Sequence, residues 1–133
     1  MPTVATFDIE YLQYLGPDGT LVREDLPEFA KDRRNLVELF KNMLKVRNFD
    51  TKAVALQRTG KLGTYASCLG HEATHIGIGS AMQYDDVLAP SYSEYGAQFM
   101  RGVKPRDVLM YWGGDERGNE FAGPPHDYSW CVP

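Results

Sequence analysis

Cysteine is scarce in this chain of 133 residues, which contains only Cys68 and Cys131. Two cysteines are too few for a disulfide framework, and neither belongs to a C-x-x-C pair. The sequence also lacks any apolar run near the roughly 20 residues of a membrane span, and its N-terminus lacks the hydrophobic stretch of a signal peptide. These absences predict a cytoplasmic protein with reduced, partly buried thiols.

An excess of positive charge is also missing. The formal net charge of −4 argues against a general nucleic-acid binder and against a protein that binds anionic membranes. A hydrophobic content of 43% and a charged content of 24% are ordinary for a soluble globular protein. The length suits one domain, and the pattern suggests an N-terminal arm over residues 1–31 and a folded part over residues 32–133.

The arm combines short extended segments with a turn. Phe7, Ile9 and Tyr11 alternate with other residues, and the cluster Gly16-Pro17-Asp18-Gly19 is a turn signal before Thr20-Leu21-Val22. Such an arm is expected to pack on a neighbouring surface, because it has too few apolar residues for a core of its own.

The folded part has mainly helical periodicity. Apolar spacing predicts a long helix from an N-cap at Asp32 to a stop at Gly60, and further helices over 71–82, over 94–101 and from Pro105 onward. Gly77 and Gly79 weaken the second of these, which predicts that another helix or a cofactor approaches closely there. A short buried strand is expected over 87–89, and a long ordered loop over 115–129.

The run His71-Glu72-Ala73-Thr74-His75 has the spacing of a zinc-hydrolase signature. Two histidines at i and i+4 share a helical face and can bind one zinc ion, with Glu72 as general base and Glu94 or His126 as a further ligand. The same spacing also occurs in packing helices whose histidines cap the helix, donate hydrogen bonds or face solvent. The residues alone leave both interpretations open.

A longer set of motifs resembles a known family. It consists of three segments and a dipeptide: Gln57-Arg58-Thr59-Gly60-Lys61-Leu62-Gly63-Thr64-Tyr65, Gly70-His71-Glu72-Ala73, Asp86-Val87-Leu88-Ala89-Pro90-Ser91-Tyr92, and Arg101-Gly102. In order and spacing the chain is similar to the alpha subunit of the thiamine-diphosphate-dependent component of 2-oxo-acid dehydrogenase complexes, pyruvate dehydrogenase type. The resemblance implies oxidative decarboxylation of a 2-oxo acid, here pyruvate, with transfer of the acyl unit to a lipoyl group.

The resemblance also implies cofactors and partners. Thiamine diphosphate with Mg²⁺ would lie between this subunit and a beta subunit in an alpha2-beta2 heterotetramer, and a lipoyl acyltransferase would take up the acyl group. Tyr92 and Ser93 match the family's cofactor-contacting Tyr-Arg pair, Val132 matches a main-chain contact to the aminopyrimidine, and Ala66 matches a substrate-facing position. No residue of this chain is assigned a catalytic role.

Two departures from the family pattern modify these expectations. Ser93 replaces an arginine that holds the diphosphate, so either another cation supplies that charge or diphosphate affinity is weaker. The family's Gly-Asp-Gly turn for magnesium is also missing, since Gly114-Asp115-Glu116 lacks the second glycine. The resemblance implies the N-terminal part of a doubly wound, thiamine-diphosphate-binding α/β fold, and in this chain that part is expected to be mostly helical with an incomplete sheet. Its exposed apolar surface would favour self-association, and a non-catalytic interaction or oligomerisation fragment is the alternative function.

Overall fold

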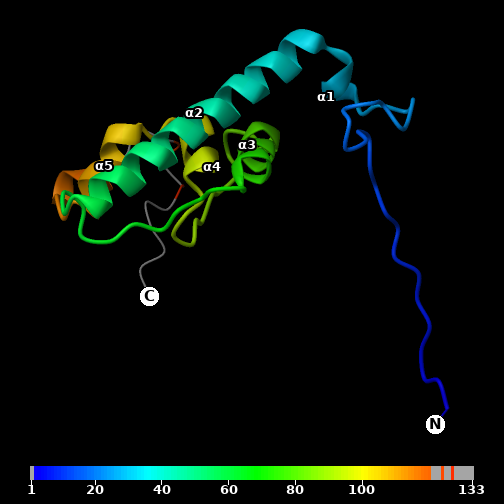
Figure 1. The fold of residues 1–133 in the computed structure, drawn as a ribbon, viewed down its shortest axis with the longest axis horizontal. Helices are drawn as coiled ribbons and strands as arrows, with labels where there is room; N and C mark the ends of the chain where they lie inside the picture. The colour runs from blue at the N-terminus through cyan, green and yellow to red at the C-terminus, as the bar shows by residue number, and fades with distance from the viewer. Residues whose placement is uncertain (1, 121–123, 125–126, 128–133) are drawn as a thin grey trace. The chain divides into compact units, whose positions relative to one another are not determined.

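The structure, a computed structural model, describes residues 2–120, 124 and 127 (Figure 1). The chain divides between Leu36 and Val37 into two compact units, the second of which holds far more of the internal contacts. Each unit is therefore described by itself. No helix in the described ranges is both long and apolar enough to cross a membrane.

The described residues of the first unit, 2–36, contain the predicted turn but no strands. The Gly16 N–H donates to the Thr20 carbonyl at 2.8 Å, and the Asp18 carboxylate accepts hydrogen bonds from the backbone and side chain of Thr20. Leu15 and Leu21 form an isolated antiparallel bridge. The extended segments predicted on either side of the turn do not pair further, and a short helix, α1 (Glu28–Lys31), follows.

Helix α2 (Arg33–Arg58) confirms the long helix that the sequence predicted. The Asp32 carboxylate accepts a hydrogen bond from the Arg34 N–H at 2.9 Å, as an N-cap should. At the other end Gly60 has a φ of +71°, which a residue with a side chain rarely adopts. The Lys61 N–H then donates to the Leu56 carbonyl and the Gly60 N–H to the Gln57 carbonyl, which is the Schellman pattern.

The remaining helices lie close to their predicted positions. They are α3 (Glu72–Ala81), α4 (Tyr95–Met100) and α5 (Pro105–Trp112), with Pro105 in the first turn of α5. Within the predicted loop over 115–129, the described residues include a short 3-10 helix, η1 (Glu116–Asn119). The segment between α2 and α3 runs back along α2, as the green trace in Figure 1 shows.

The strand predicted over 87–89 is wrong. These residues have no regular secondary structure, and the Leu88 N–H donates to the Asp127 carboxylate at 2.9 Å instead of to a neighbouring strand. The described residues contain no strand at all, so this part of the chain is helical and shows no sheet. A strand requires a partner for its backbone groups, and here a side chain satisfies one of them.

The core of the second unit draws on every helix from α2 to α5. Phe49 of α2 makes edge-on ring contacts with Tyr65, Tyr95 and Phe99, with centroids 6.2, 5.7 and 5.1 Å away. Tyr65 stacks on Tyr95 with an interplanar angle of 15°. The fully buried members are Val46, Ala53, Cys68, Tyr95 and Val108. These rings fix where the α2–α3 segment and α4 lie relative to α2.

Helices α3 and α4 approach each other closely at glycine, as predicted for the glycine-containing helix. A Cβ added at Gly79 would lie 2.6 Å from the Met100 Cβ and 3.1 Å from the Ala97 Cα, and one added at Gly96 would lie 2.6 Å from the His75 Cβ. The close neighbour is therefore a helix. At Gly77, by contrast, a Cβ would meet nothing within 4 Å.

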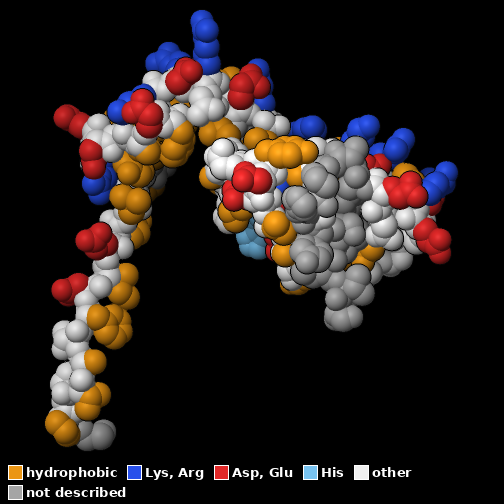
Figure 2. Space-filling view, turned by 180° about the vertical axis from the view of Figure 1, so that it is seen from behind, with side chains coloured by type: hydrophobic (Ala, Val, Ile, Leu, Met, Phe, Trp, Pro, Cys, Tyr) orange, Lys and Arg blue, Asp and Glu red, His pale blue; other side chains and the backbone are white. Residues whose placement is uncertain are grey.

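The second unit also exposes apolar side chains, some of which are visible among charged ones in Figure 2. They include Phe40 and Leu44 on α2, Leu69 before α3, Ile78 on α3, and Tyr84, Val87 and Tyr92 before α4. Exposed apolar side chains of this kind are typical of a surface that other polypeptide covers. Self-association of the chain stays a prediction.

Substituting the two glycines of α3 should have opposite effects. Gly79→Ala should lower the free energy of unfolding by about 1–3 kcal/mol, because the new methyl group overlaps rigid atoms of α4. Gly77→Ala, two residues away and unobstructed, should raise it by about 0.5–1 kcal/mol through helix propensity alone. Urea unfolding followed by circular dichroism measures both. Equal effects of the two substitutions would contradict the close approach at Gly79.

Candidate functional site

A buried carboxylate holds the segment that joins α2 to α3. Asp50 of α2 is 2% exposed and accepts hydrogen bonds from the Tyr65 hydroxyl, the Ser67 hydroxyl and the Cys68 N–H, at 2.8, 2.7 and 2.8 Å. A buried charge is tolerated only when donors surround it in this way. Burial and the bond to Asp50 raise the pKa of Tyr65, so its hydroxyl stays protonated and remains a donor.

Tyr95 connects two of the residues that the sequence assigned to the site. Its hydroxyl oxygen lies 2.9 Å from the carbonyl oxygen of Ala66 and 2.9 Å from that of Tyr92. The hydroxyl carries one proton and donates to one carbonyl at a time. Burial raises the pKa of Tyr95, so the proton stays in place. The structure thus brings Ala66 and Tyr92 to the same buried hydroxyl.

Sequence reasoning missed both Asp50 and Tyr95. The signals were present: an acid on the apolar face of a long helix, and a tyrosine three residues after Tyr92 at the start of the next helix. An acid on a buried face needs donors nearby, and those donors come from residues 15 to 18 positions later. Patterns within a few residues of Asp50 in the sequence therefore could not identify these donors.

Tyr92 and Ser93 form the turn into α4 and differ in exposure. The Tyr92 side chain is 61% exposed, whereas Ser93 is buried. Both backbone N–H groups donate to one carboxylate oxygen of Glu94, at 3.0 and 3.1 Å. This turn therefore offers an aromatic ring to a ligand, but its two N–H groups are already occupied by an acid.

The structure says less about Ala66, Val132 and the two cysteines. Ala66 is half-buried, and its carbonyl faces Tyr95. Val132 lies outside the described residues, as do Cys131 and His126. Cys68 is buried, and burial together with the Asp50 charge raises its pKa to about 12, so it is a poor nucleophile.

The zinc-hydrolase interpretation fails on the role of Glu72. Its carboxylate forms an ion pair with the Arg47 Nε at 2.5 Å and accepts a hydrogen bond from the Gly70 N–H. The Arg47 partner holds the pKa of Glu72 at about 2, so this acid cannot take a proton from water near neutral pH. Among the described side chains no group of His, Cys, Asp and Glu is arranged to hold a metal ion.

The two histidines of the motif lie in different environments on α3. One is at the N-cap and the other packs inside the fold. His71 is the exposed N-cap residue, and its ring centroid lies 5.6 Å from that of His75. His75 is buried, and within the part of the chain that the structure describes its Nδ1 atom has no hydrogen-bond partner. This arrangement agrees with the packing-helix alternative.

Arg101 is a buried cation, with only 8% of its surface exposed. Its guanidinium makes a two-bond ion pair with Asp127, both bonds at 2.8 Å. It also donates to the carbonyls of Gln83 and Asp86. Arg101 therefore fixes the turn at residues 83–86, from which the chain leads on to Tyr92.

Removing the Asp50 charge should loosen the α2–α3 segment. In Asp50→Asn an amide N–H₂ faces donors that need an acceptor, so the free energy of unfolding should fall by about 2–3 kcal/mol. Hydrogen exchange at the Cys68 amide should accelerate as well. Asp85→Asn, at an exposed acid, is the matched control and should change neither quantity. Unchanged exchange at Cys68 in Asp50→Asn would refute the anchoring role.

His75 should make stability depend on pH below neutrality. Burial lowers the pKa of His75 from its ordinary 6.5, against the opposing effect of the nearby Glu94 and Glu72 carboxylates. The unfolded chain then binds the proton more readily, so stability is complete above pH 6.5 and falls as the pH drops below it. Glu72 adds no slope there, because its stabilisation is lost only between about pH 4.5 and pH 2.

Urea unfolding at pH 5, 6 and 7 measures this effect. The His75→Gln variant should show a flatter dependence of stability on pH than the unsubstituted chain, whatever its absolute stability. His71→Gln should retain most of the original slope, because burial, the main cause of the lowered His75 pKa, is unchanged and only the smaller effect of the His71 charge is lost. A slope that survives in His75→Gln would assign it to another group.

Comparisons of the sequence with known proteins identify a family. The sequence pattern of the family described as "Dehydrogenase E1 component" matches residues 40–126. The chain is 38% identical over 131 residues to the 3-methyl-2-oxobutanoate dehydrogenase subunit alpha of Mycobacterium tuberculosis, which covers 95% of this chain and 33% of the relative.

Other relatives carry a different name. The chain is 38% identical over 103 residues to the pyruvate dehydrogenase E1 component subunit alpha of Acholeplasma laidlawii, covering 77% of this chain and 29% of the relative. It is 31% identical over 112 residues to the subunit of that name from Staphylococcus aureus, covering 84% and 30%. The chain spans about a third of the length of these relatives. The matched pattern covers more than half of the chain, and the chain belongs to the dehydrogenase E1 component family.

Proposed function

We propose that this chain is the N-terminal part of the alpha subunit of a thiamine-diphosphate-dependent 2-oxo-acid dehydrogenase. In this proposal it supplies one wall of a cofactor site completed by further polypeptide and by a beta subunit. The observation that carries the proposal is the convergence of Ala66 and Tyr92, two positions that the family resemblance assigns to substrate and cofactor, on the Tyr95 hydroxyl.

The described residues fit the cofactor in part. When bound, thiamine diphosphate supplies the carbanion that attacks a keto carbon, and the protein orients the reactants. The exposed Tyr92 ring can pack against a heterocycle. The Tyr92–Ser93 turn does not fit a diphosphate, because Glu94 occupies its N–H groups and adds negative charge. No reaction step is therefore assigned to residues of this chain, and the magnesium–diphosphate ligands are expected elsewhere.

The substrate proposed is a 2-oxo acid, with pyruvate as the first choice from the sequence. The relatives are named for two acids, pyruvate and 3-methyl-2-oxobutanoate. Ala66 is small and half-buried, so it leaves room for either side chain. Transfer of the acyl unit to the lipoyl group of an acyltransferase, the alpha2-beta2 assembly and a cytoplasmic location belong to the same proposal.

Purification of the native polypeptide from its source cells through a tag tests this function. A beta subunit and a lipoyl acyltransferase should copurify, and the assembly should reduce ferricyanide when given pyruvate or 3-methyl-2-oxobutanoate. Tyr92→Ala should weaken thiamine diphosphate binding by roughly tenfold, about 1.4 kcal/mol. Tyr84→Ala, at another exposed tyrosine, is the matched control and should not weaken it.

The outcomes separate the candidate functions. Copurification of a beta subunit without 2-oxo-acid oxidation would favour the non-catalytic interaction module. Absence of a beta subunit would contradict both. The isolated 133-residue chain should show no micromolar, magnesium-dependent binding of thiamine diphosphate by titration calorimetry, and such binding would refute a shared site.

A further inference from the structure

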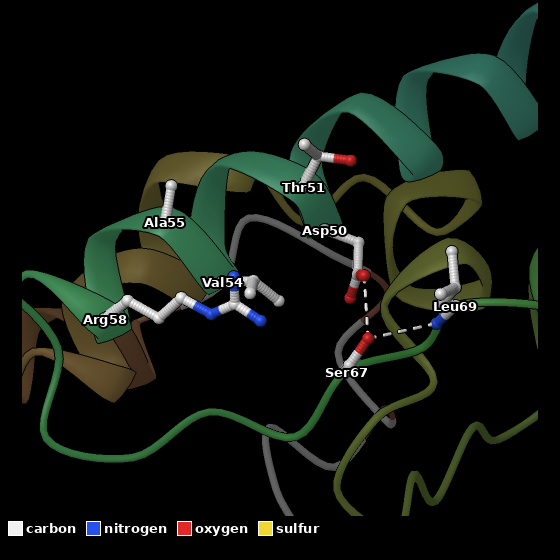
Figure 3. Close-up of a pocket in the computed structure, with 7 residues that line it drawn as sticks. All are labelled: Asp50, Thr51, Val54, Ala55, Arg58, Ser67 and Leu69. Atoms are coloured by element: carbon white, nitrogen blue, oxygen red, sulfur yellow. Dashed lines mark hydrogen bonds between the residues drawn. The ribbon is translucent and has the colours of Figure 1, made fainter.

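An open pocket of about 550 Å³ lies between the C-terminal half of α2 and the segment that carries Ser67 and Leu69 (Figure 3). This volume falls within the roughly 300–1,000 Å³ typical of small-molecule sites. Ala66, Tyr92 and Ser93 are not among its lining residues. The pocket is therefore separate from the residues to which the proposed function assigns a ligand.

One cation points into this pocket. The Arg58 side chain leaves the last turn of α2 and extends into the space between the helix and Ser67 (Figure 3). Within the described ranges its guanidinium has neither an ion pair nor a hydrogen bond, whereas Arg47 and Arg101 each have a carboxylate partner. An unpaired guanidinium presents a fork of donors that matches a carboxylate with two parallel hydrogen bonds.

The remaining walls are largely apolar. Val54 and Ala55 line the side formed by α2, and Leu69 lines the opposite side and is 62% exposed. Covering an exposed leucine with an apolar group is favourable by about 25 cal/mol per Å² of apolar surface removed from water. The pocket thus combines one cationic group with an uncovered apolar surface.

Asp50 limits the charge that the pocket accepts. Its carboxylate also lines the pocket, and its oxygens already accept hydrogen bonds from Tyr65, Ser67 and Cys68. It has no need of a ligand donor, but its negative charge opposes a second negative charge nearby. With one unpaired arginine and one buried acid, the chemistry favours an anion of single charge over a phosphate dianion.

We propose that this pocket binds small monocarboxylates with a short apolar chain. The carboxylate lies at the Arg58 guanidinium, and the chain packs against Val54 and Leu69. Ser67, whose hydroxyl also binds Asp50, forms the far wall. The inference concerns the isolated chain and does not depend on the proposed cofactor site.

Titration of the isotopically labelled 133-residue chain with hexanoate, followed by nuclear magnetic resonance, tests the proposal. Saturable shifts should appear at the amides of Ser67 and Leu69 and at the Arg58 side chain. Hexanol and hexylamine, with the same chain but no negative charge, should bind at least fivefold more weakly. Equal binding of hexanol would show that the pocket recognises only the apolar chain and not the carboxylate, which would overturn the proposal. Absence of saturable hexanoate binding would overturn it as well.

Variants identify the residues responsible. Arg58→Gln should weaken hexanoate binding at least fivefold, and Arg58→Lys should weaken it less because the charge remains. Leu69→Ala should weaken hexanoate and hexanol alike. Lys52→Gln, which removes a charge from the same helix outside the pocket, is the matched control and should change affinity less than twofold. Unaltered affinity in a folded Arg58→Gln protein would overturn the assignment.

Discussion

The arrangement of the second unit depends on one buried charge. The Asp50 carboxylate lies on the face of α2 that packs inward, where an unsatisfied anion would cost several kcal/mol. Among the described residues its donors come from the α2–α3 segment, through Tyr65, Ser67 and Cys68. The charge therefore fixes the path of a glycine-containing segment that has no regular hydrogen bonding of its own. Tyr65, held in this way, stacks on Tyr95 and sets the position of α4.

Two ion pairs hold the start of α3 and the end of α4 in place in a similar way. Glu72 binds Arg47 of α2 and the Gly70 N–H, which places the first turn of α3. Arg101 joins the turn near Gln83 to Asp127. Glu72, Arg101 and Asp127 are buried or half-buried, whereas Arg47 is exposed, and each has its opposite charge within hydrogen-bonding distance. Their role is to orient segments, because a buried ion pair contributes little net stability but tolerates only one geometry.

The helices were predictable from the sequence because their signals are local. Asp32 caps α2, Gly60 ends it, and Pro105 begins α5, and each signal acts within one turn of the residue that carries it. The strand predicted over 87–89 was wrong because its formation depends on a distant partner. Its apolar residues fit a strand, but a strand forms only with a partner, and here the Leu88 N–H binds the Asp127 side chain.

The site was only half predictable for the same reason. Resemblance pointed to Ala66 and Tyr92, yet it could not show that both carbonyls meet Tyr95, since the contact joins residues 29 positions apart. The histidine motif instead suggested a site that the described residues do not form. Its spacing was right for zinc, but Glu72 pairs with Arg47, which lies 25 residues earlier in the chain. Spacing along a helix defines which side chains share a face. What those side chains do is decided by the partner that the fold places opposite them, and in this chain that partner is an arginine.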